Sequence, residues 1–238
     1  MFEQCILQRY CDFLTSSDNQ FGFKKKSGCV HAIYALKCTA DYYVSHNSTV
    51  NLCALDLSKA FDKMNHHALF LKLMKNHIPV SLLRLLEIWF ESSSTCVKWG
   101  NCFSDFFKLT CGIRQSGVLS PHLFAVYIDS VIEKIRASEY GCVINWAKVG
   151  ILVYADDILL LAPSVHSLQN LLRICEVELQ LLDMTINPYP AKVGPMDPVM
   201  HLPVSYSKTV FGKNAKKLEF VIGLLSNNLR SQQSICHV

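Results

Sequence analysis

The sequence predicts an α+β fold, in which strands and helices are mixed in irregular order around one hydrophobic core. Half of the 238 residues are hydrophobic and 18% are charged, which suits a globular chain that can bury a sizeable core. The predicted elements follow one another without a repeated strand–helix–strand period, so their order favours a layered mixed architecture over a doubly wound parallel sheet. The chain contains no internal repeat and no low-complexity tract.

Periodicity and capping residues predict four elements in the first half of the chain. They are a helix over residues 29–45, a buried strand over 50–57, a helix over 65–76 and a helix from 81 to about 91. The strand is almost continuously apolar, which is typical of a strand covered on both faces. Asn65 is a candidate N-cap because its side chain can accept a hydrogen bond from the first helical turn.

Turn signals and helix starts divide the second half. The predicted elements are a hairpin of residues 95–99 and 103–110 around Gly100-Asn101, a helix from Ser120-Pro121 to about residue 137 with Ser120 as its cap, a hairpin centred on Asp156-Asp157, and a helix over 164–183 capped by Ser164. Five prolines between residues 188 and 203 predict irregular chain after these elements.

Composition and charge exclude several classes of protein. Eleven cysteines without a C-x-x-C pair predict reduced thiols with no disulfide partner, and hence an intracellular protein of the nucleus or the cytoplasm. The most apolar stretch, residues 151–162, is shorter than the ~20 residues that span a bilayer, so no membrane association is predicted. The net charge of +4 arises within residues 205–238. Bulk charge therefore does not indicate a nucleic-acid-binding protein, and function must be inferred from motifs.

Two adjacent acids, Asp156 and Asp157, interrupt this most apolar stretch. Neighbouring carboxylates repel each other and cost free energy to desolvate, so a hairpin that carries them between buried strands is suited to holding a hard cation. An ordinary Asp-Asp turn is the alternative interpretation, since aspartate is a common turn residue.

A third acid, Asp56, ends the other strongly apolar strand. If the two strands are neighbours in one sheet, Asp56 faces Asp156 and Asp157, and three carboxylates surround one point. Such a cluster can bind a pair of divalent ions roughly 3.5 to 4 Å apart, one activating an attacking hydroxyl and the other stabilising a leaving phosphate oxygen. The hypothesis from these residues is phosphoryl-transfer chemistry.

Four segments, taken in order, resemble the successive motifs of a reverse transcriptase of the non-LTR (LINE-class) retrotransposons. They are Gln20-Phe21-Gly22-Phe23, the run from Asp56 through Asp62 to His66, the run from Cys111 to Pro121, and Tyr154-Ala155-Asp156-Asp157. The resemblance covers about residues 18–187. It implies a right-hand polymerase palm, an antiparallel sheet backed by the helices at Leu123 and Leu168, with partial fingers and no thumb. The implied domains are partial fingers over 1–49, a palm-like core over 50–187 and a divergent tail over 188–238.

The resemblance also implies the metal site and its partners. Asp56 and Asp156 would be the principal metal ligands, Asp157 an auxiliary ligand, and the Leu57 carbonyl a further oxygen ligand. The implied cofactor is a pair of Mg²⁺ ions, for which Mn²⁺ can substitute. The implied partners are an RNA template, a DNA primer and deoxynucleoside triphosphates.

Nucleotide-binding residues follow from the same resemblance. Phe61 would lie under the sugar of the incoming nucleotide and exclude a 2′-hydroxyl, the group that separates RNA from DNA building blocks. Gln115 would contact the nucleotide or the template, and Lys24 and Lys26 would reach triphosphate or template phosphates. From the residues alone, a core position is the favoured interpretation of Phe61. The lysines are interpretable equally well as a solvated loop or as a phosphate site.

Further residues carry implied or alternative roles. Tyr154 would approach the primer end, Arg114 would bind primer or template or remain a surface charge, and Lys192 is the candidate proton donor to pyrophosphate. Asp62 is expected to cap the following helix. His66 lacks metal-ligand spacing with any second histidine or cysteine, so no ligand role is assigned to it.

The largest departure from the family pattern is Pro188-Tyr189-Pro190-Ala191-Lys192, where the family typically continues with a pair of lysines and a strand. Another departure is Ser116, which stands where the family usually has glycine. A side chain there would crowd the template or nucleotide, or oppose a positive φ. Two functions therefore stay open: an RNA-directed DNA polymerase fragment that works by two-metal nucleotidyl transfer, and a catalytically inactive remnant that keeps the palm fold as an RNA-binding or interaction module. A metal-dependent hydrolase is a more distant third.

Overall fold

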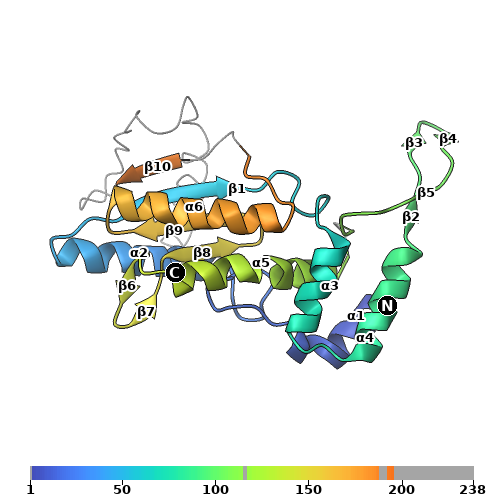
Figure 1. Ribbon diagram of the computed structural model, residues 1–238, viewed down its shortest axis with the longest axis horizontal. Helices are drawn as coiled ribbons and strands as arrows, with labels where there is room; N and C mark the ends of the chain where they lie inside the picture. The colour runs from blue at the N-terminus through green and yellow to red at the C-terminus, as the bar shows by residue number, and fades with distance from the viewer. Residues whose placement is uncertain (1, 115–116, 188–191, 196–238) are drawn as a thin grey trace, which may run out of the picture.

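A four-stranded antiparallel sheet lies at the centre of the computed structural model, which describes residues 2–114, 117–187 and 192–195 (Figure 1). The strand order is β10 (Lys192–Pro195), β1 (Asn51–Asp56), β9 (Asp157–Ala162) and β8 (Ile151–Tyr154). Each neighbouring pair runs antiparallel. Strands far apart in the sequence are therefore adjacent in space.

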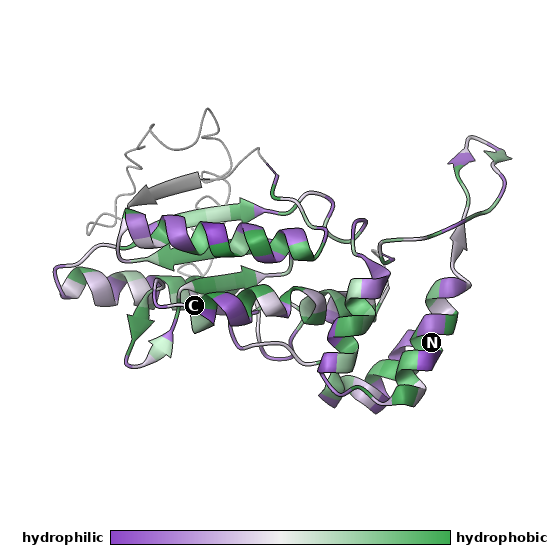
Figure 2. Ribbon diagram, viewed as in Figure 1, coloured by the Kyte–Doolittle hydropathy of each residue, from purple (hydrophilic) through white to green (hydrophobic). Residues whose placement is uncertain are grey.

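The sheet is covered on both faces, and the side-chain alternation of its strands decides which residues lie on each. Helices α5 (Ser120–Ala137) and α6 (Val165–Leu181) pack on one face, where Cys53 and Leu160 join the main core. Helix α2 (Cys29–Ser45) packs on the other face, where Leu152 and Leu161 join a smaller cluster. In Figure 2, α6 shows hydrophilic and hydrophobic bands in alternation, as expected of a helix with one buried face. The predicted α+β class, an antiparallel sheet backed by two helices, is confirmed.

A second group of elements extends from one end of the sheet (Figure 1). The helices there are α1 (Phe2–Tyr10), α3 (His66–Lys75) and α4 (Val80–Glu91), with a short 3₁₀ turn over Cys11–Phe13. An arm projects beyond α4 and consists of two short ladders, β2 (Ser94–Thr95) with β5 (Phe107–Lys108) and β3 (Lys98–Trp99) with β4 (Cys102–Phe103). This arm is the hairpin predicted around Gly100.

Helix boundaries follow the predicted caps at two positions and depart from them at two others. Asn65 accepts a hydrogen bond from the Ala68 amide at 3.1 Å, and Ser164 accepts one from the Ser167 amide at 3.1 Å, as predicted. The expectation that Asp62 caps the third helix is wrong, because Asn65 occupies that position. Ser120 is likewise the first residue of α5 and not its cap, so the predicted start is displaced by one residue.

Several parts of the fold were not predicted by pattern. Helix α1 carries a single buried residue, Ile6, so its periodicity is weak. The hairpin of β6 (Val143–Ile144) and β7 (Ala147–Lys148) turns through Asn145-Trp146, both at positive φ, without the Asn-Gly signal that marks such turns. Strand β10 lies within the segment predicted to be irregular, where pairing with β1 outweighs the local proline content.

The cysteines of the described ranges are free thiols, ten in all. Burial raises the pKa of Cys53 to about 12 and raises the pKa of Cys175 as well. Buried thiols with raised pKa values behave as small hydrophobic side chains and react slowly. Among the described helices, none has both the length and the apolar content that a membrane crossing requires.

Candidate active site

Three of the candidate site residues lie in a row across the sheet. In the antiparallel register, Asp56 at the end of β1 lies opposite Asp157 on β9, and Asp157 lies opposite Tyr154 on β8. Directly opposed residues of antiparallel strands point to the same face, with Cβ atoms about 4.5 to 5.5 Å apart. The three side chains therefore lie on the face of the sheet against which α2 packs. Asp157 and Tyr154 are exposed there, and Asp56 is half-buried.

Asp156 lies in the tight turn that joins β8 to β9. Tyr154 pairs with Asp157, so the turn consists of Ala155 and Asp156 alone. The predicted hairpin is confirmed, but its centre is one residue earlier than expected and Asp157 belongs to the strand. Ala155 has a φ of 58°, in the left-handed region that strains an alanine. Positive φ at only the first turn residue is the pattern of a type II′ turn, where glycine is usual.

The Asp56 carboxylate is oriented by a residue that sequence reasoning did not identify. The Asn187 side-chain Nδ2 donates to Asp56 Oδ2 at 3.1 Å, and the Asn187 amide donates to the Asp56 carbonyl at 2.8 Å. Next to this contact, Leu57 forms a bridge with Ile186. The chain beyond α6 thus extends the sheet past the end of β1. No local signal could have linked two residues that are 131 positions apart.

The carboxylates suit a hard divalent cation in their chemistry, although they do not form a closed ligand cage. Within the parts of the chain that the structure describes, no group of three or more histidine, cysteine or acidic side chains is close enough to hold a metal ion. Mg²⁺ is usually bound through one or two carboxylates together with water and substrate phosphates. A cross-strand pair such as Asp56 and Asp157 fits that mode of binding.

The second and third motifs lie against each other through backbone hydrogen bonds. The Ile113 amide donates to the Phe61 carbonyl at 2.8 Å, and the Gly112 amide donates to the Met64 carbonyl at 2.8 Å. Gly112 has a φ of 79°, and a Cβ there would lie 2.6 Å from the Asp62 carbonyl oxygen. His66, for which no ligand role was predicted, contacts the Gly112 carbonyl through Nε2 at 2.6 Å.

Phe61 is half-buried and held between two other rings. It stacks on Phe124 of α5 with ring centroids 4.8 Å apart, and it meets Phe23 edge to face at 6.4 Å. Phe23 comes from the first motif and Phe124 from the helix behind the sheet. The packing fixes the position of Phe61, and this is compatible both with a core role and with a rigid platform beside the site.

The remaining predicted residues differ in how they are placed. The Lys24 ammonium donates to the Ser17 carbonyl at 2.6 Å, and burial lowers the pKa of Lys24 although Asp18 and Asp129 act against this. Lys26 and Arg114 are exposed. The Lys192 backbone pairs with Ala54 on β1. Gln115 and Ser116 lie outside the described residues.

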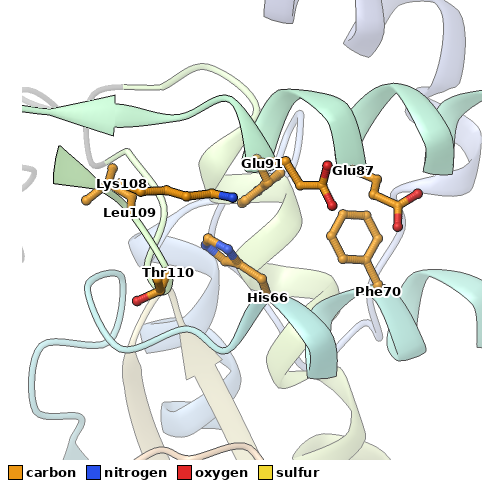
Figure 3. Close-up of a pocket in the computed structure, with 8 residues that line it drawn as sticks. His66, Phe70, Glu87, Glu91, Lys108, Leu109 and Thr110 are labelled. Atoms are coloured by element: carbon orange, nitrogen blue, oxygen red, sulfur yellow. The ribbon is translucent and has the colours of Figure 1, made fainter. Parts of the chain in front are cut away.

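One cavity lies beside the candidate site residues, and another lies apart from the aspartates. A cavity of about 150 Å³ lies between α2 and the sheet, and its lining includes Tyr154, Asp157 and Cys29. Burial and the Asp157 charge raise the pKa of the Cys29 thiol. A larger cavity of about 320 Å³ lies between α3, α4 and β5, where Figure 3 shows Lys108 extending from β5 toward the side of α4 that carries Glu91. None of the three aspartates lines this second cavity.

An antiparallel sheet backed by two helices, with paired carboxylates at adjacent strand ends beside a tight turn, defines the palm of a right-hand nucleotide polymerase. The chain belongs to the family described as reverse transcriptase (RNA-dependent DNA polymerase), whose model matches residues 2–198. The predicted resemblance is thereby confirmed. Reverse transcriptases in general depend on divalent metal ions.

Curated relatives come from retrotransposons. The chain is 30% identical over 129 residues to the Pol polyprotein from the type-1 retrotransposable element R2 of Nasonia vitripennis, a match that covers 54% of this chain and 12% of that protein. It is 27% identical over 171 residues to the RNA-directed DNA polymerase from the mobile element jockey of Drosophila funebris, covering 69% of this chain and 18% of that protein. The chain therefore spans less than a fifth of the length of either relative.

Solved structures of similar fold include telomerases. The telomerase of Candida tropicalis, solved in complex with a fragment of telomeric RNA, superposes with a TM-score of 0.63 at 14% identity, over 93% of this chain and 40% of that chain. The telomerase of Candida albicans superposes with a TM-score of 0.57 at 11% identity, over 84% of this chain and 34% of that chain. At this level of identity the similarity concerns the fold, and the predicted palm architecture is confirmed by it.

Proposed function

We propose that this chain is the fingers-and-palm part of a retrotransposon reverse transcriptase and that it extends a DNA primer on an RNA template. The observation that carries the proposal is the row of Asp56, Asp157 and Tyr154 on one face of the sheet, beside the turn that holds Asp156. Membership of the reverse transcriptase family and the names of the retrotransposon relatives support it. In this proposal, fingers occupy residues 1–49 and the palm core 50–187.

The proposed metal ligands are the carboxylates of Asp56 and Asp156, with Asp157 as an auxiliary ligand and the Leu57 carbonyl as a further oxygen. Two Mg²⁺ ions bound there would lower the pKa of the primer hydroxyl and stabilise the leaving pyrophosphate. The chain itself holds these ligands in position. Asn187 orients the Asp56 carboxylate through its 3.1 Å hydrogen bond, so the direction of this ligand is set before any ion binds.

Phe61 is proposed as the residue that excludes a 2′-hydroxyl from the incoming nucleotide. Its ring is buttressed by Phe124 on one side and by Phe23 on another, so it cannot yield readily to a bulkier sugar. A rigid obstacle discriminates against an added hydroxyl better than a mobile one, because the wrong substrate then meets an unrelieved steric clash. Gln115 is proposed to contact the same nucleotide or the template.

Phosphate and primer contacts complete the proposal. Lys26 is exposed, whereas the Lys24 ammonium is engaged by the Ser17 carbonyl, so Lys26 is the better placed of the two for a triphosphate. Tyr154, on the same face as the carboxylates, is proposed to lie at the primer end, and Arg114 to contact primer or template. Lys192 is proposed as the proton donor to pyrophosphate.

Primer extension tests the proposed function. A DNA primer on an RNA template should be extended with deoxynucleotides and Mg²⁺ by the unmodified protein, and chelation of Mg²⁺ should stop the reaction. The Asp156→Asn protein serves as the blank, because an amide keeps the size of the side chain and removes its charge. Extension that survives Asp156→Asn would contradict the assigned roles.

An inactive remnant is the alternative that Ser116 raises, because the family usually has glycine at that position. Family membership and the retrotransposon relatives do not favour it over the polymerase. Under the polymerase proposal, Ser116→Gly should raise the rate of extension, because it removes a side chain from the template or nucleotide path and restores freedom to adopt positive φ. Thermal unfolding of both proteins checks that the gain does not reflect stability alone. Absence of extension before and after Ser116→Gly would favour the remnant.

A further inference from the structure

We propose that Gln20 is a positioning residue that holds the turn carrying Asp156 in the conformation the metal site requires. The inference rests on the proposed function, which assigns Asp156 as a metal ligand. Gln20 belongs to the first motif, more than 130 residues before the turn, and it is completely buried. A completely buried polar side chain beside a candidate catalytic turn calls for a physical explanation.

The Gln20 side-chain amide forms hydrogen bonds with both the backbone amide and the backbone carbonyl of Ala155. Its Oε1 accepts hydrogen bonds from the Ala155 amide at 3.2 Å and from the Gly22 amide at 2.9 Å, and its Nε2 donates to the Ala155 carbonyl at 3.3 Å. A side-chain amide suits this arrangement, because it offers a neutral donor and an acceptor in one planar group. Both polar atoms of Gln20 are thereby satisfied.

The segment around Gln20 is also anchored by hydrogen bonds that do not involve Ala155. The Phe21 amide donates to the Val153 carbonyl at 2.8 Å, and the Val153 amide donates to the Asn19 carbonyl at 2.8 Å. The segment therefore runs beside β8 as a short parallel bridge. Gly22 completes the fit, since a Cβ at this position would lie 2.6 Å from the Ala155 nitrogen. The segment at Gly22 therefore lies so close to the turn at Ala155 that no side chain fits between them.

The turn needs an external support because Ala155 is strained at a φ of 58°. An alanine released from that conformation relaxes toward negative φ, and the rotation would redirect the next residue, Asp156. Metal ligands must be held close to their productive geometry by surrounding groups. Gln20 supplies that support without touching substrate or metal, so it acts through Ala155.

The test compares Gln20→Leu with the matched variant Asn19→Leu. Asn19 is also a buried amide of the same segment, but its Nδ2 donates to the Ile151 carbonyl at 2.7 Å, at the opposite end of β8 from the turn. Both variants remove buried hydrogen bonds and should lower the melting temperature. Only Gln20→Leu should accelerate hydrogen exchange of the Ala155 amide and raise, by about tenfold or more, the Mg²⁺ concentration that half-saturates extension.

A double variant separates positioning from general damage. Adding Ala155→Gly to Gln20→Leu gives the turn a residue that adopts positive φ without strain, so the Mg²⁺ requirement should return toward that of the unmodified protein. The inference is overturned if Gln20→Leu and Asn19→Leu change Ala155 exchange and Mg²⁺ dependence equally. Failure of the unmodified protein to extend a primer would contradict only the proposed function. The hydrogen-exchange measurement would still test whether Gln20 holds the backbone of Ala155.

Discussion

Asp56→Asn is expected to reduce primer extension by about 10³-fold or more while leaving the protein folded. Charge stabilisation by a bound divalent ion contributes several kcal/mol to the transition state, and each 1.36 kcal/mol lost lowers the rate tenfold. The asparagine keeps an oxygen that can still accept the hydrogen bond from Asn187 Nδ2. The loss of rate would therefore report the missing charge and not a displaced strand.

The melting temperature measured with and without Mg²⁺ provides a second test of the proposed metal site. Asp56 and Asp157 are directly opposed across two strands, and like charges in such pairs destabilise a sheet by a few tenths of a kcal/mol to about 1 kcal/mol. In the absence of metal, Asp56→Asn should be at least as stable as the unmodified protein. Added Mg²⁺ should raise the melting temperature of the unmodified protein and not that of the variant, because only the former binds the ion in its folded state.

Two further variants bracket the effect of Asp56→Asn. Asp157→Asn should cost less activity, since Asp157 is proposed as the auxiliary ligand. Asp105→Asn, in an exposed segment of the arm between β4 and β5, should leave both activity and Mg²⁺ stabilisation unchanged. Equal losses from Asp56→Asn and Asp105→Asn would show that the two aspartates act only through net charge, and the proposed metal site would then be wrong.

Local sequence patterns were sufficient for most of the fold. The apolar stripes of α2, α5 and α6 predicted their extents to within a few residues, and the side chains of Asn65 and Ser164 predicted two helix starts. These features depend on neighbours within one or two turns of helix. The hairpin at Asn145-Trp146 escaped prediction because both turn residues adopt positive φ without being glycine.

The candidate site was predictable only in part, for a physical reason. Its carboxylates are visible in the sequence because acids at the ends of apolar strands are conspicuous. The contacts that orient them are not, because Asn187 and Gln20, although Gln20 belongs to the first motif, reach their partners across more than 130 residues. Local sequence therefore reveals the reacting groups more readily than the contacts that hold them.

Gly112→Ala is expected to lower the free energy of unfolding by about 2 to 5 kcal/mol, the sum of two separate penalties. At a φ of 79°, an alanine carries the left-handed strain of roughly 1 to 2 kcal/mol. Its Cβ would also lie 2.6 Å from the Asp62 carbonyl oxygen, and relief of such overpacking costs typically 1 to 3 kcal/mol. Chemical denaturation of both proteins measures the sum.

Gly100→Ala separates these two penalties. Gly100 has a φ of 60°, but nothing lies within 4 Å of the Cβ that alanine would add. Strain without collision should therefore cost about 1 kcal/mol or less, since the exposed arm can also open locally. A similar loss from Gly112→Ala and Gly100→Ala would mean that the segment around Gly112 is not closely seated on Asp62.

The steric clash introduced by Gly112→Ala should also alter the candidate site. Backbone hydrogen bonds join Ile113 to Phe61 and Gly112 to Met64, so a shift that relieves the contact with Asp62 displaces the segment that carries Phe61. Gly112→Ala should then weaken discrimination against ribonucleotides in addition to lowering stability, whereas Gly100→Ala should leave discrimination intact. Competition between deoxynucleotides and ribonucleotides in the extension assay measures this. Unchanged discrimination in a clearly destabilised Gly112→Ala protein would place the role of Phe61 in the core and remove it from substrate selection.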